Sequence, residues 1–259
     1  MKNRIKTTYI GQNYIWKEEI DSTNEEAKRL GREGAPQGTV EAAAQQTKGR
    51  GRRGRRWESP GGDNIYLSIL LKPKFEPSKA SMLTLMAALA AAEALEQCCQ
   101  VSCQIKWPND LVINQKKACG ILTEMLTDHG GISSIIVGIG INVNTENFPK
   151  EIDHMATSLK KETGKEQDFQ EIIASLLEKF EEYYEIFMEH LSLRPFMEEY
   201  NKRLINAGQQ VQILTGSEVA IRTAHGINEN GALIVSDERG RMEKIISGEV
   251  SVRGLYGYV

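Results

Sequence analysis

Hydrophobic and polar positions divide the chain into a long first part with mixed elements and a shorter second part made of strands. We expect strands where apolar residues alternate or run together, and helices where they recur every three to four residues. The strands expected in the first part are Tyr14–Glu19, Thr39–Gln46, Asn64–Leu71, Ser102–Trp107, Leu111–Ile113, Ala118–Leu126 and Ile132–Ile141. The expected helices run from the start signal Asp21-Ser22-Thr23-Asn24 to about Arg32, from Ser78 to about Gln97, over Phe169–His190 and over Arg194–Ile205.

From Ala207 onward the pattern changes to short strands separated by turn residues, with Asn230-Gly231 and Arg239-Gly240 as the clearest turns. The expected strands are Gln210–Leu214, Val219–Ile227, Ala232–Val235, Met242–Ser247 and Glu249–Arg253. Five such strands fit a small barrel. Because strands and helices do not alternate regularly in the first part, we expect an α+β fold with a mixed sheet flanked by helices. The expected domains are residues 1–205 and 206–259.

The amino-acid composition indicates the class of protein. Hydrophobic residues make up 40% and charged residues 26% of the 259 positions, as in ordinary globular domains. The longest apolar run, Met82–Leu95, is rich in Ala and holds Glu93, so a core helix is expected rather than a membrane span. The start has no apolar segment of a secretory signal, and the four cysteines lack metal-site spacing. These features favour a reduced, cytoplasmic protein that does not contact a membrane.

Residues 48–56, here called the arginine loop, hold six cations and three glycines in a chain of net charge -3. Like charges this close repel one another, so we expect a mobile loop that becomes ordered around an anion. Its literal G-x-G-x-x-G does not indicate a dinucleotide site, because Ser59-Pro60-Gly61-Gly62 follow shortly where that motif requires a helix. Phosphate binding, nucleic-acid binding and a merely solvated run all remain open for the loop alone.

Three further stretches could carry chemistry. Lys106-Trp107-Pro108-Asn109-Asp110 ends an expected strand at a proline, so its polar side chains could point into a cleft or simply form a turn. Lys117 opens a strand whose next residues are small, although a lone lysine there is usually solvated. The glycine-rich stretch Gly138–Asn142 is either a bulged core strand or a strand thinned for a flat ligand.

Together and in this order, these stretches resemble the biotin–protein ligases. The residues that carry the resemblance are Ser22-Thr23-Asn24, Gln46, the arginine loop with Trp57, Lys106–Asp110, Lys117 with Gly120, Gly138–Asn142 and Gly248–Arg253. The resemblance implies a mixed sheet flanked by helices plus an SH3-like barrel. It also implies an ATP-dependent ligase that forms biotinyl-5′-AMP with Mg²⁺ and then biotinylates a lysine of a biotin carboxyl carrier protein domain.

The resemblance assigns roles to particular residues. Arg52 and Lys117 would be catalytic and would contact both the biotin carboxylate and the α-phosphate. Biotin would also meet Ser22, Thr23, Asn24, Gln46, Gly49, Arg50 and Gly120, and ATP would also meet Arg55, Trp57, Lys106, Asn109, Asp110 and Asn142. Asp110 would help to hold Mg²⁺, and the polar stretch Thr145–Thr157 would close over adenine.

The resemblance also bears on partners. Some family members carry an N-terminal DNA-binding domain, and only 21 residues precede Ser22, so no DNA binding is expected. A homodimer is compatible with the family. Three rival interpretations remain: a lipoate ligase, which would share the fold but lack the arginine loop, a nucleic-acid binder, which the sequence pI near 5.9 disfavours, and an inactive relative that serves as an interaction module. The presence of every expected polar residue disfavours the third.

Overall fold

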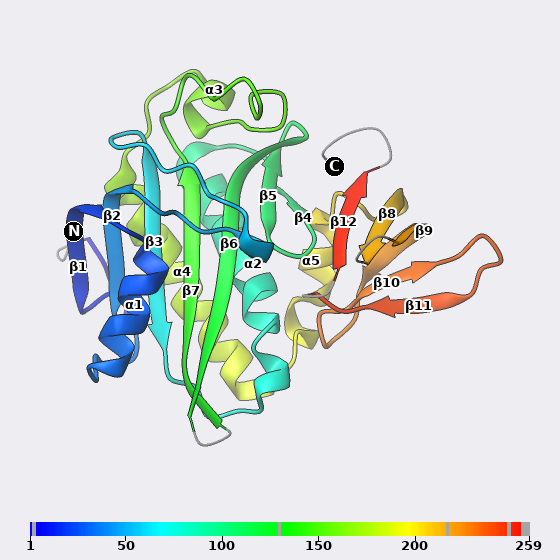
Figure 1. The fold of residues 1–259 in the computed structure, drawn as a ribbon, viewed down its shortest axis with the longest axis horizontal. Coiled ribbons are helices and arrows are strands. Elements are labelled where there is room, and N and C mark those ends of the chain that lie inside the picture. Colours follow the sequence, from blue (N-terminus) through cyan, green and yellow to red (C-terminus); the bar gives the residue numbers. More distant parts are fainter. Residues whose placement is uncertain (2–3, 129–130, 216–217, 248–249, 255–259) are drawn as a thin grey trace.

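The structure is a computed structural model that describes residues 1, 4–128, 131–215, 218–247 and 250–254. These residues form a large sheet of seven strands and a small sheet of five strands. The two sheets lie side by side along the longest axis of the molecule (Figure 1). The site described below lies on the large sheet.

The large sheet has the strand order β1-β2-β3-β7-β6-β5-β4. Its strands are β1 (Tyr14–Ile20), β2 (Val40–Gln46), β3 (Asn64–Leu71), β4 (Gln104–Lys106), β5 (Asp110–Ile113), β6 (Lys116–Asp128) and β7 (Gly131–Asn142). β1 and β2 run parallel, and the other neighbouring pairs run antiparallel. The prediction of a mixed sheet is therefore confirmed.

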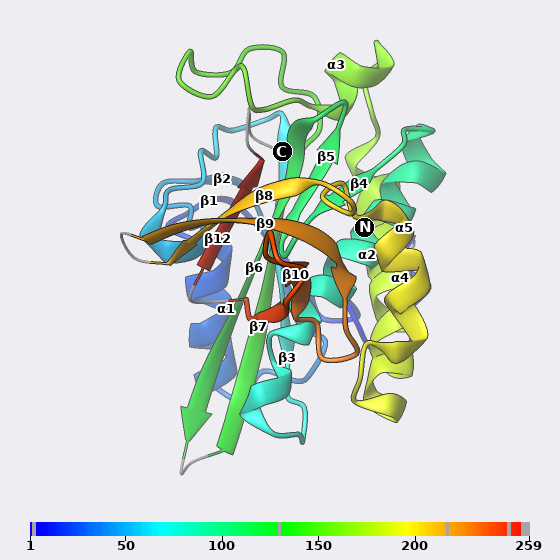
Figure 2. The same ribbon diagram turned by 90° about the vertical axis from the view of Figure 1, so that its right-hand side faces the viewer.

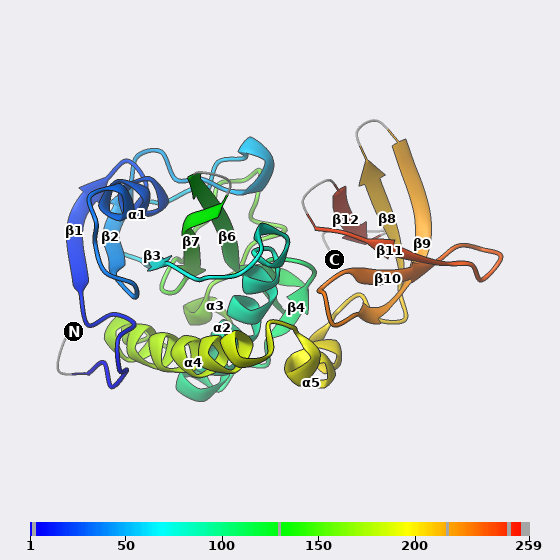
Figure 3. The same ribbon diagram turned by 90° about the horizontal axis from the view of Figure 1, so that it is seen from below.

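Helices cover both faces of the large sheet. Figure 3 shows α1 (Thr23–Arg32) on one face, and α2 (Met82–Cys99) and α4 (Phe169–His190) on the other. Among the described residues one helical stretch, Pro77–Cys99, has the length and apolar composition of a membrane span, and 72% of its most apolar window is buried. Its alanines let it fit between the sheet and α4, so it is a core helix as predicted.

The small sheet has the order β11-β10-β9-β8-β12, with every neighbouring pair antiparallel. Its strands are β8 (Gln210–Thr215), β9 (Glu218–Ile227), β10 (Leu233–Ser236), β11 (Met242–Ile245) and β12 (Val250–Gly254). Within the described residues no ladder joins β11 to β12, and Figure 2 shows β9 arching across the sheet. The Trp107 indole N–H donates to the Gly231 carbonyl at 3.1 Å and ties this sheet to the large one.

Most predicted elements are present, with ends shifted by a few residues. The helix predicted from Arg194 is the short 3₁₀ turn η3 (Arg194–Phe196) followed by α5 (Met197–Arg203), and η2 (Pro77–Lys79) precedes α2. Sequence reasoning missed α3 (Leu159–Thr163), although the Ser158 hydroxyl accepts from the Lys161 N–H as an N-cap. The predicted turn Asp128–Gly131 and the predicted strand start at Glu249 include residues outside the described ones.

Candidate active site

A row of paired residues crosses the centre of the large sheet and forms the floor of an inner hollow. Ser68 of β3, Gly138 of β7 and Leu122 of β6 are neighbours in this row. A Cβ atom at Gly138 would lie 2.0 Å from Asn24 Oδ1, so only glycine lets α1 approach the sheet here. The Asn24 amide donates to the Leu122 carbonyl at 3.2 Å, and its Oδ1 lies 2.6 Å from Ser68 Oγ.

The next row along the same strands supports an aromatic ring. It consists of Tyr66, Gly140 and Gly120. Cβ atoms at either glycine would lie 2.7 Å from the Trp57 indole, so the two glycines make room for its flat ring. Lys117 Nζ lies 4.9 Å from the ring centroid, a cation–π contact. The glycines of Gly138–Asn142 thus make room for a flat ring, here the indole of Trp57, and the predicted flat ligand on this strand stays a prediction.

The inner hollow between these rows has a cavity volume of about 50 Å³, far below the roughly 300 Å³ of an ordinary small-molecule site. Thr23 and Gln46 form one wall: the Gln46 side-chain carbonyl accepts from the Thr23 N–H at 2.9 Å, and its amide donates to Ser59 Oγ at 2.9 Å. The hollow is lined by Ser22, Thr23, Asn24, Gln46, Arg50, Gly51, Arg52, Trp57, Tyr66, Asn109, Lys117, Gly120, Ile121, Leu122, Gly138, Ile139 and Gly140.

The arginine loop forms a hairpin over this hollow and includes the 3₁₀ turn η1 (Arg52–Gly54). The Trp57 N–H donates to the Gly49 carbonyl at 3.0 Å, and in Figure 1 η1 lies in front of β6. Gly49 does not line the hollow, but a Cβ atom there would lie 2.4 Å from the Trp57 carbonyl, so this glycine shapes the hairpin. The predicted mobility of the loop stays a prediction.

Two arginines attach the loop to opposite sides of the hollow. Arg50 pairs with Glu25 on α1 and lies 3.5 Å from Glu124 on β6. Arg52 donates to Asn109 Oδ1 at 2.9 Å at the start of β5. Burial holds the pKa of the Arg52 guanidinium below its ordinary value, and the nearby carboxylate of Asp110 opposes that shift.

A larger outer hollow of about 920 Å³ opens on the other side of Trp57. It shares Gln46, Trp57 and Lys117 with the inner hollow. Its lining consists of Gln45, Gln46, Thr47, Arg55, Arg56, Trp57, Glu58, Ser59, Pro60, Asn64, Asp110, Lys117, Asn142, Thr145, Asn147, Phe148, Pro149, Ile152, Met155 and Ala156.

The backbone of Lys117 holds the polar stretch 145–157 against this hollow. The Lys117 N–H donates to the Met155 carbonyl at 2.7 Å, and the Thr157 N–H donates to the Lys117 carbonyl at 2.9 Å. The Asn142 amide also donates to the Thr157 carbonyl, at 3.0 Å, so Asn142 both lines the hollow and fixes this stretch. The role predicted for the stretch, closing over adenine, stays a prediction.

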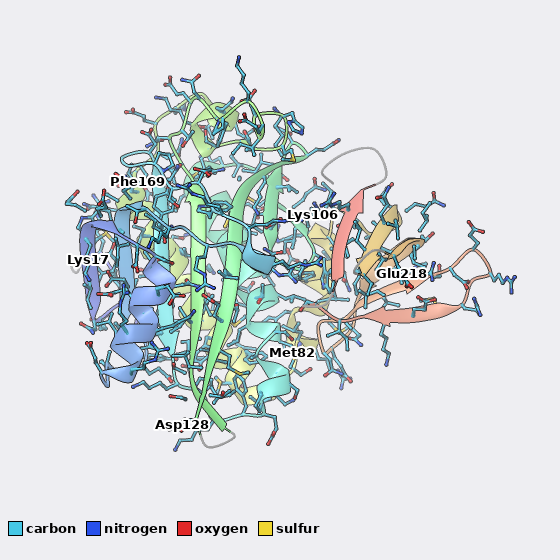
Figure 4. All side chains as sticks on the ribbon, in the orientation of Figure 1. Lys17, Met82, Lys106, Asp128, Phe169 and Glu218 are labelled. Atoms are coloured by element: carbon cyan, nitrogen blue, oxygen red, sulfur yellow. The ribbon has the colours of Figure 1, made fainter. Side chains whose placement is uncertain are left out.

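Charges meet where the two hollows join. Lys117 Nζ lies 2.6 Å from Asp110 Oδ1, and the Asn109 amide donates to the same oxygen at 3.0 Å. Lys106 does not line either hollow; it is 6% exposed and lies toward β12 (Figure 4). Burial lowers the pKa of Lys106 to about 8, while Asp110 opposes the shift.

The structure therefore brings together almost every residue that sequence reasoning selected. Ser22, Thr23, Asn24, Gln46, Arg50, Arg52, Asn109, Lys117 and Gly120 line the inner hollow, whereas Arg55, Trp57, Asp110 and Asn142 line the outer one. Sequence reasoning missed Tyr66 and Ser68, although the alternation Asn64, Tyr66, Ser68 along β3 marks one polar face of a buried strand. It also missed Glu124, whose partners come from distant segments.

Comparison with known proteins identifies the family. Residues 16–142 match the biotin/lipoate A/B protein ligase family, and residues 207–253 match the biotin protein ligase C terminal domain. The chain is 36% identical over 250 residues to the bifunctional ligase/repressor BirA of Bacillus spizizenii, covering 96% of this chain and 76% of that protein. It is 32% identical to a biotin–[acetyl-CoA-carboxylase] ligase of Paracoccus denitrificans, covering 85% of this chain and 93% of that protein.

Solved structures agree with this result. The biotin protein ligase of Aquifex aeolicus in complex with biotin and ATP superposes with a TM-score of 0.83 and 37% identity, covering 94% of this chain and 99% of that chain. This match spans both sheets, because it covers nearly the whole of each chain. The chain is therefore a member of the biotin/lipoate A/B protein ligase family, within its biotin protein ligase branch.

Proposed function

We propose that this enzyme joins biotin to ATP where the inner and outer hollows meet, and then passes biotin to a lysine of a carrier protein. The observation that carries this proposal is that Lys117 and Trp57 line both hollows. A ligand of two parts, one in each hollow, would place its reactive junction beside these side chains. We assign biotin to the inner hollow and the nucleotide to the outer one, and the structure of the Aquifex aeolicus relative in complex with biotin and ATP supports a site for both ligands.

In the first step the biotin carboxylate attacks the α-phosphorus of ATP, and pyrophosphate leaves. Negative charge is concentrated at the junction during this attack, so fixed positive charges accelerate it. Lys117 and Arg52 supply them, since both line the inner hollow. The indole N–H of Trp57 is buried without a partner among the described residues, and it offers a donor to the incoming ligand.

In the second step the amine of a carrier lysine attacks the acyl carbon of biotinyl-5′-AMP. An amide forms, a proton leaves the amine, and AMP departs. Nothing in either step requires a covalent enzyme intermediate, so the residues act by positioning and by neutralising charge. At about 50 Å³ the inner hollow must enlarge to accept biotin, and we propose that it does so by movement of the hairpin that carries Trp57.

Mg²⁺ would be held mainly by the phosphates. The described residues contain no group of three or more His, Cys, Asp or Glu side chains that could hold a metal. A magnesium ion bound through phosphates needs only one or two carboxylates, and Asp110 lines the outer hollow. The ion would neutralise the phosphate charge and so favour the departure of pyrophosphate.

One experiment tests the proposal directly. The purified chain is incubated with labelled biotin, ATP, Mg²⁺ and a biotin carboxyl carrier protein domain, and label on the carrier is measured. We expect label that requires both ATP and the carrier lysine, and that is lost when EDTA removes Mg²⁺. Transfer of lipoate but not biotin would overturn the proposal in favour of the rival ligase.

The cellular setting remains a prediction that fits this reaction. The four cysteines are free thiols, three of them buried, as expected in a reducing compartment. We therefore propose a cytoplasmic enzyme, and fractionation of cells that express it is the test. The sedimentation coefficient of the purified chain tests whether it forms a homodimer.

A further inference from the structure

A cluster of charged and polar side chains lies beside the inner hollow and joins Asn24 and Arg50, which line it, to Glu25, Lys28 and Glu124, which have no assigned role. Its centre is Glu124 on β6, which is 18% exposed. One carboxylate oxygen accepts from Lys28 Nζ at 2.8 Å, and the other accepts from the Asn24 amide at 2.8 Å. Arg50 Nη2 lies 3.5 Å from the first oxygen. One carboxylate thus contacts the first turn of α1, its second turn and the arginine loop.

The contact with Asn24 fixes how this amide is turned. An amide can rotate by half a turn and exchange its donor and acceptor. Glu124 accepts from the Nδ2 side, while Ser68 Oγ lies 2.6 Å from Oδ1. A rotated amide would place its oxygen against the carboxylate, which is repulsive. Glu124 therefore selects one orientation of an Asn24 side chain that lines the inner hollow.

The contact with Arg50 fixes the N-terminal end of the arginine loop. Arg50 is bound by two carboxylates, Glu25 on α1 and Glu124 on β6. Lys28 also bridges these two acids, with 2.8 Å contacts to each, and so balances their charge. Glu25 and Glu124 differ in one respect that matters for a test. Both hold Arg50, but only Glu124 also holds Asn24.

We propose that Glu124 is a positioning residue for the biotin ligase reaction. It couples the floor of the inner hollow, through Asn24, to the N-terminal end of the arginine loop, through Arg50. This inference rests on the proposed function, because it takes the inner hollow as the biotin site. The alternative is that Glu124 forms an ion pair that only stabilises the fold. In that case a substitution would lower stability but would leave biotin affinity unchanged.

Glu124→Gln is the first variant. It keeps the size of the side chain but removes the charge, and it replaces one acceptor oxygen with a donor. We expect biotin affinity, measured by calorimetry, to fall about tenfold, the size of one hydrogen bond of about 1.4 kcal/mol. We expect kcat at saturating biotin and KM for ATP to change less than about twofold, because Lys117 and the outer hollow are untouched.

Glu25→Gln and Glu26→Gln are the matched variants. Glu25→Gln weakens the contacts of Glu25 with Arg50 and Lys28 but leaves Glu124 on Asn24, so trypsin should cut within residues 48–56 faster than in the parent while biotin affinity stays near the parent value. Glu124→Gln should show both the faster cleavage and the weaker binding. Glu26 pairs with Lys17 and Arg29 away from the hollow, so Glu26→Gln should change neither.

A double-variant cycle separates positioning from stability. Asn24→Ala should weaken biotin binding in the parent and should weaken it much less in the Glu124→Gln background, because the orienting contact is already lost. Equal losses in the two backgrounds would overturn the proposal, as would parent-like biotin affinity of a folded Glu124→Gln. A parent chain that fails to bind biotin would instead overturn the proposed function.

Discussion

The inner and outer hollows share three residues but are built on different principles. Buried side chains of strands and α1 form the floor of the inner hollow, and Asn24, Thr23 and Gln46 each have an internal hydrogen-bond partner there. The outer hollow is about eighteen times larger, and much of its wall comes from the stretch 145–157 and the end of the arginine loop. The inner hollow is small and lined by paired donors and acceptors, and the outer one is large, with charges at its inner end.

This difference indicates how two sites on one sheet can bind two substrates in different ways. Polar groups that are buried must be paired, so each group on the inner floor can face a ligand in only one way, which favours selection. Much of the outer wall comes from connecting segments, whose side chains have fewer internal partners, so binding there relies more on charge and on backbone that can adjust. Lys117 lines both hollows, so a substitution at this residue is the most direct test of how the two sites work together.

Lys117→Ala should have the largest effect. It removes a positive charge placed at the junction, and losses of this kind cost about 10²–10³-fold in rate. Biotin-dependent exchange of label between pyrophosphate and ATP measures the first step alone. Lys116→Ala is the control, because Lys116 Nζ donates only to the Asp153 carbonyl at 3.3 Å. Exchange at the parent rate in Lys117→Ala would remove this lysine from the reaction.

Gly138→Ala should damage the inner hollow and spare the outer one. The new methyl group would lie 2.0 Å from Asn24 Oδ1, and overpacking of this kind costs about 1–3 kcal/mol. We expect biotin affinity to fall about 10- to 100-fold with little change in KM for ATP. Gly131→Ala on the same strand is the control, because the nearest atom to its new methyl group is 3.8 Å away. Similar effects of the two variants would contradict the comparison.

Lys106 offers a test on the outer side through pH. Burial lowers its pKa to about 8 from the ordinary value of 10.5, so below pH 8 the folded state keeps this buried side chain charged at a net cost. Between pH 8 and 10.5 the unfolded chain binds more protons, so this lysine's contribution to stability rises with pH. The unfolding free energy of Lys106→Met should therefore exceed that of the parent, and the difference should be largest at pH 7. Its advantage in unfolding free energy should narrow by about 2 kcal/mol by pH 9.5, at roughly 1.4 kcal/mol per pH unit. Urea unfolding at both pH values measures this, and a constant difference would mean that the pKa of Lys106 is ordinary.

The smallest expected effect concerns the loop between the hollows. Biotin and ATP together should slow tryptic cleavage within residues 48–57 about tenfold, which corresponds to about 1.4 kcal/mol of added order. Cleavage after Arg239 or Arg241, in the exposed turn between β10 and β11, is an internal control for the activity of the protease. An unchanged rate in the arginine loop, with both ligands shown to bind, would mean that the loop does not close over them.

The sequence predicted strands and site residues well for reasons that can be named. β3 and α4 have their predicted ends, because an alternating run and an amphipathic repeat are local signals. Asn24, Gln46 and Lys117 were selected through a family resemblance, and they meet in one hollow although they lie far apart in the chain. Gly49 does not line the inner hollow, and glycine is needed there for the hairpin; its predicted contact with biotin stays a prediction.

Other features could not be predicted from local patterns. The position of Lys106 behind the outer hollow depends on how the small sheet packs against β4 and β5, and no periodicity encodes that packing. The contact of Glu124 with Asn24 joins residues a hundred positions apart. The five C-terminal strands were predicted, but their order depends on contacts between strands.

By itself, the sequence determined which segments are strands and helices, that cations and glycines gather in one loop, and which glycines occur along β7. Local backbone preference and the periodicity of apolar residues are properties of neighbouring positions, so a linear reading captures them. Tertiary structure alone decided that the glycines lie beneath Asn24 and Trp57, that Lys117 joins two hollows, and that Glu124 connects α1 to the arginine loop. These contacts depend on strand register and on the docking of α1, which are fixed only when distant segments bury their surfaces together.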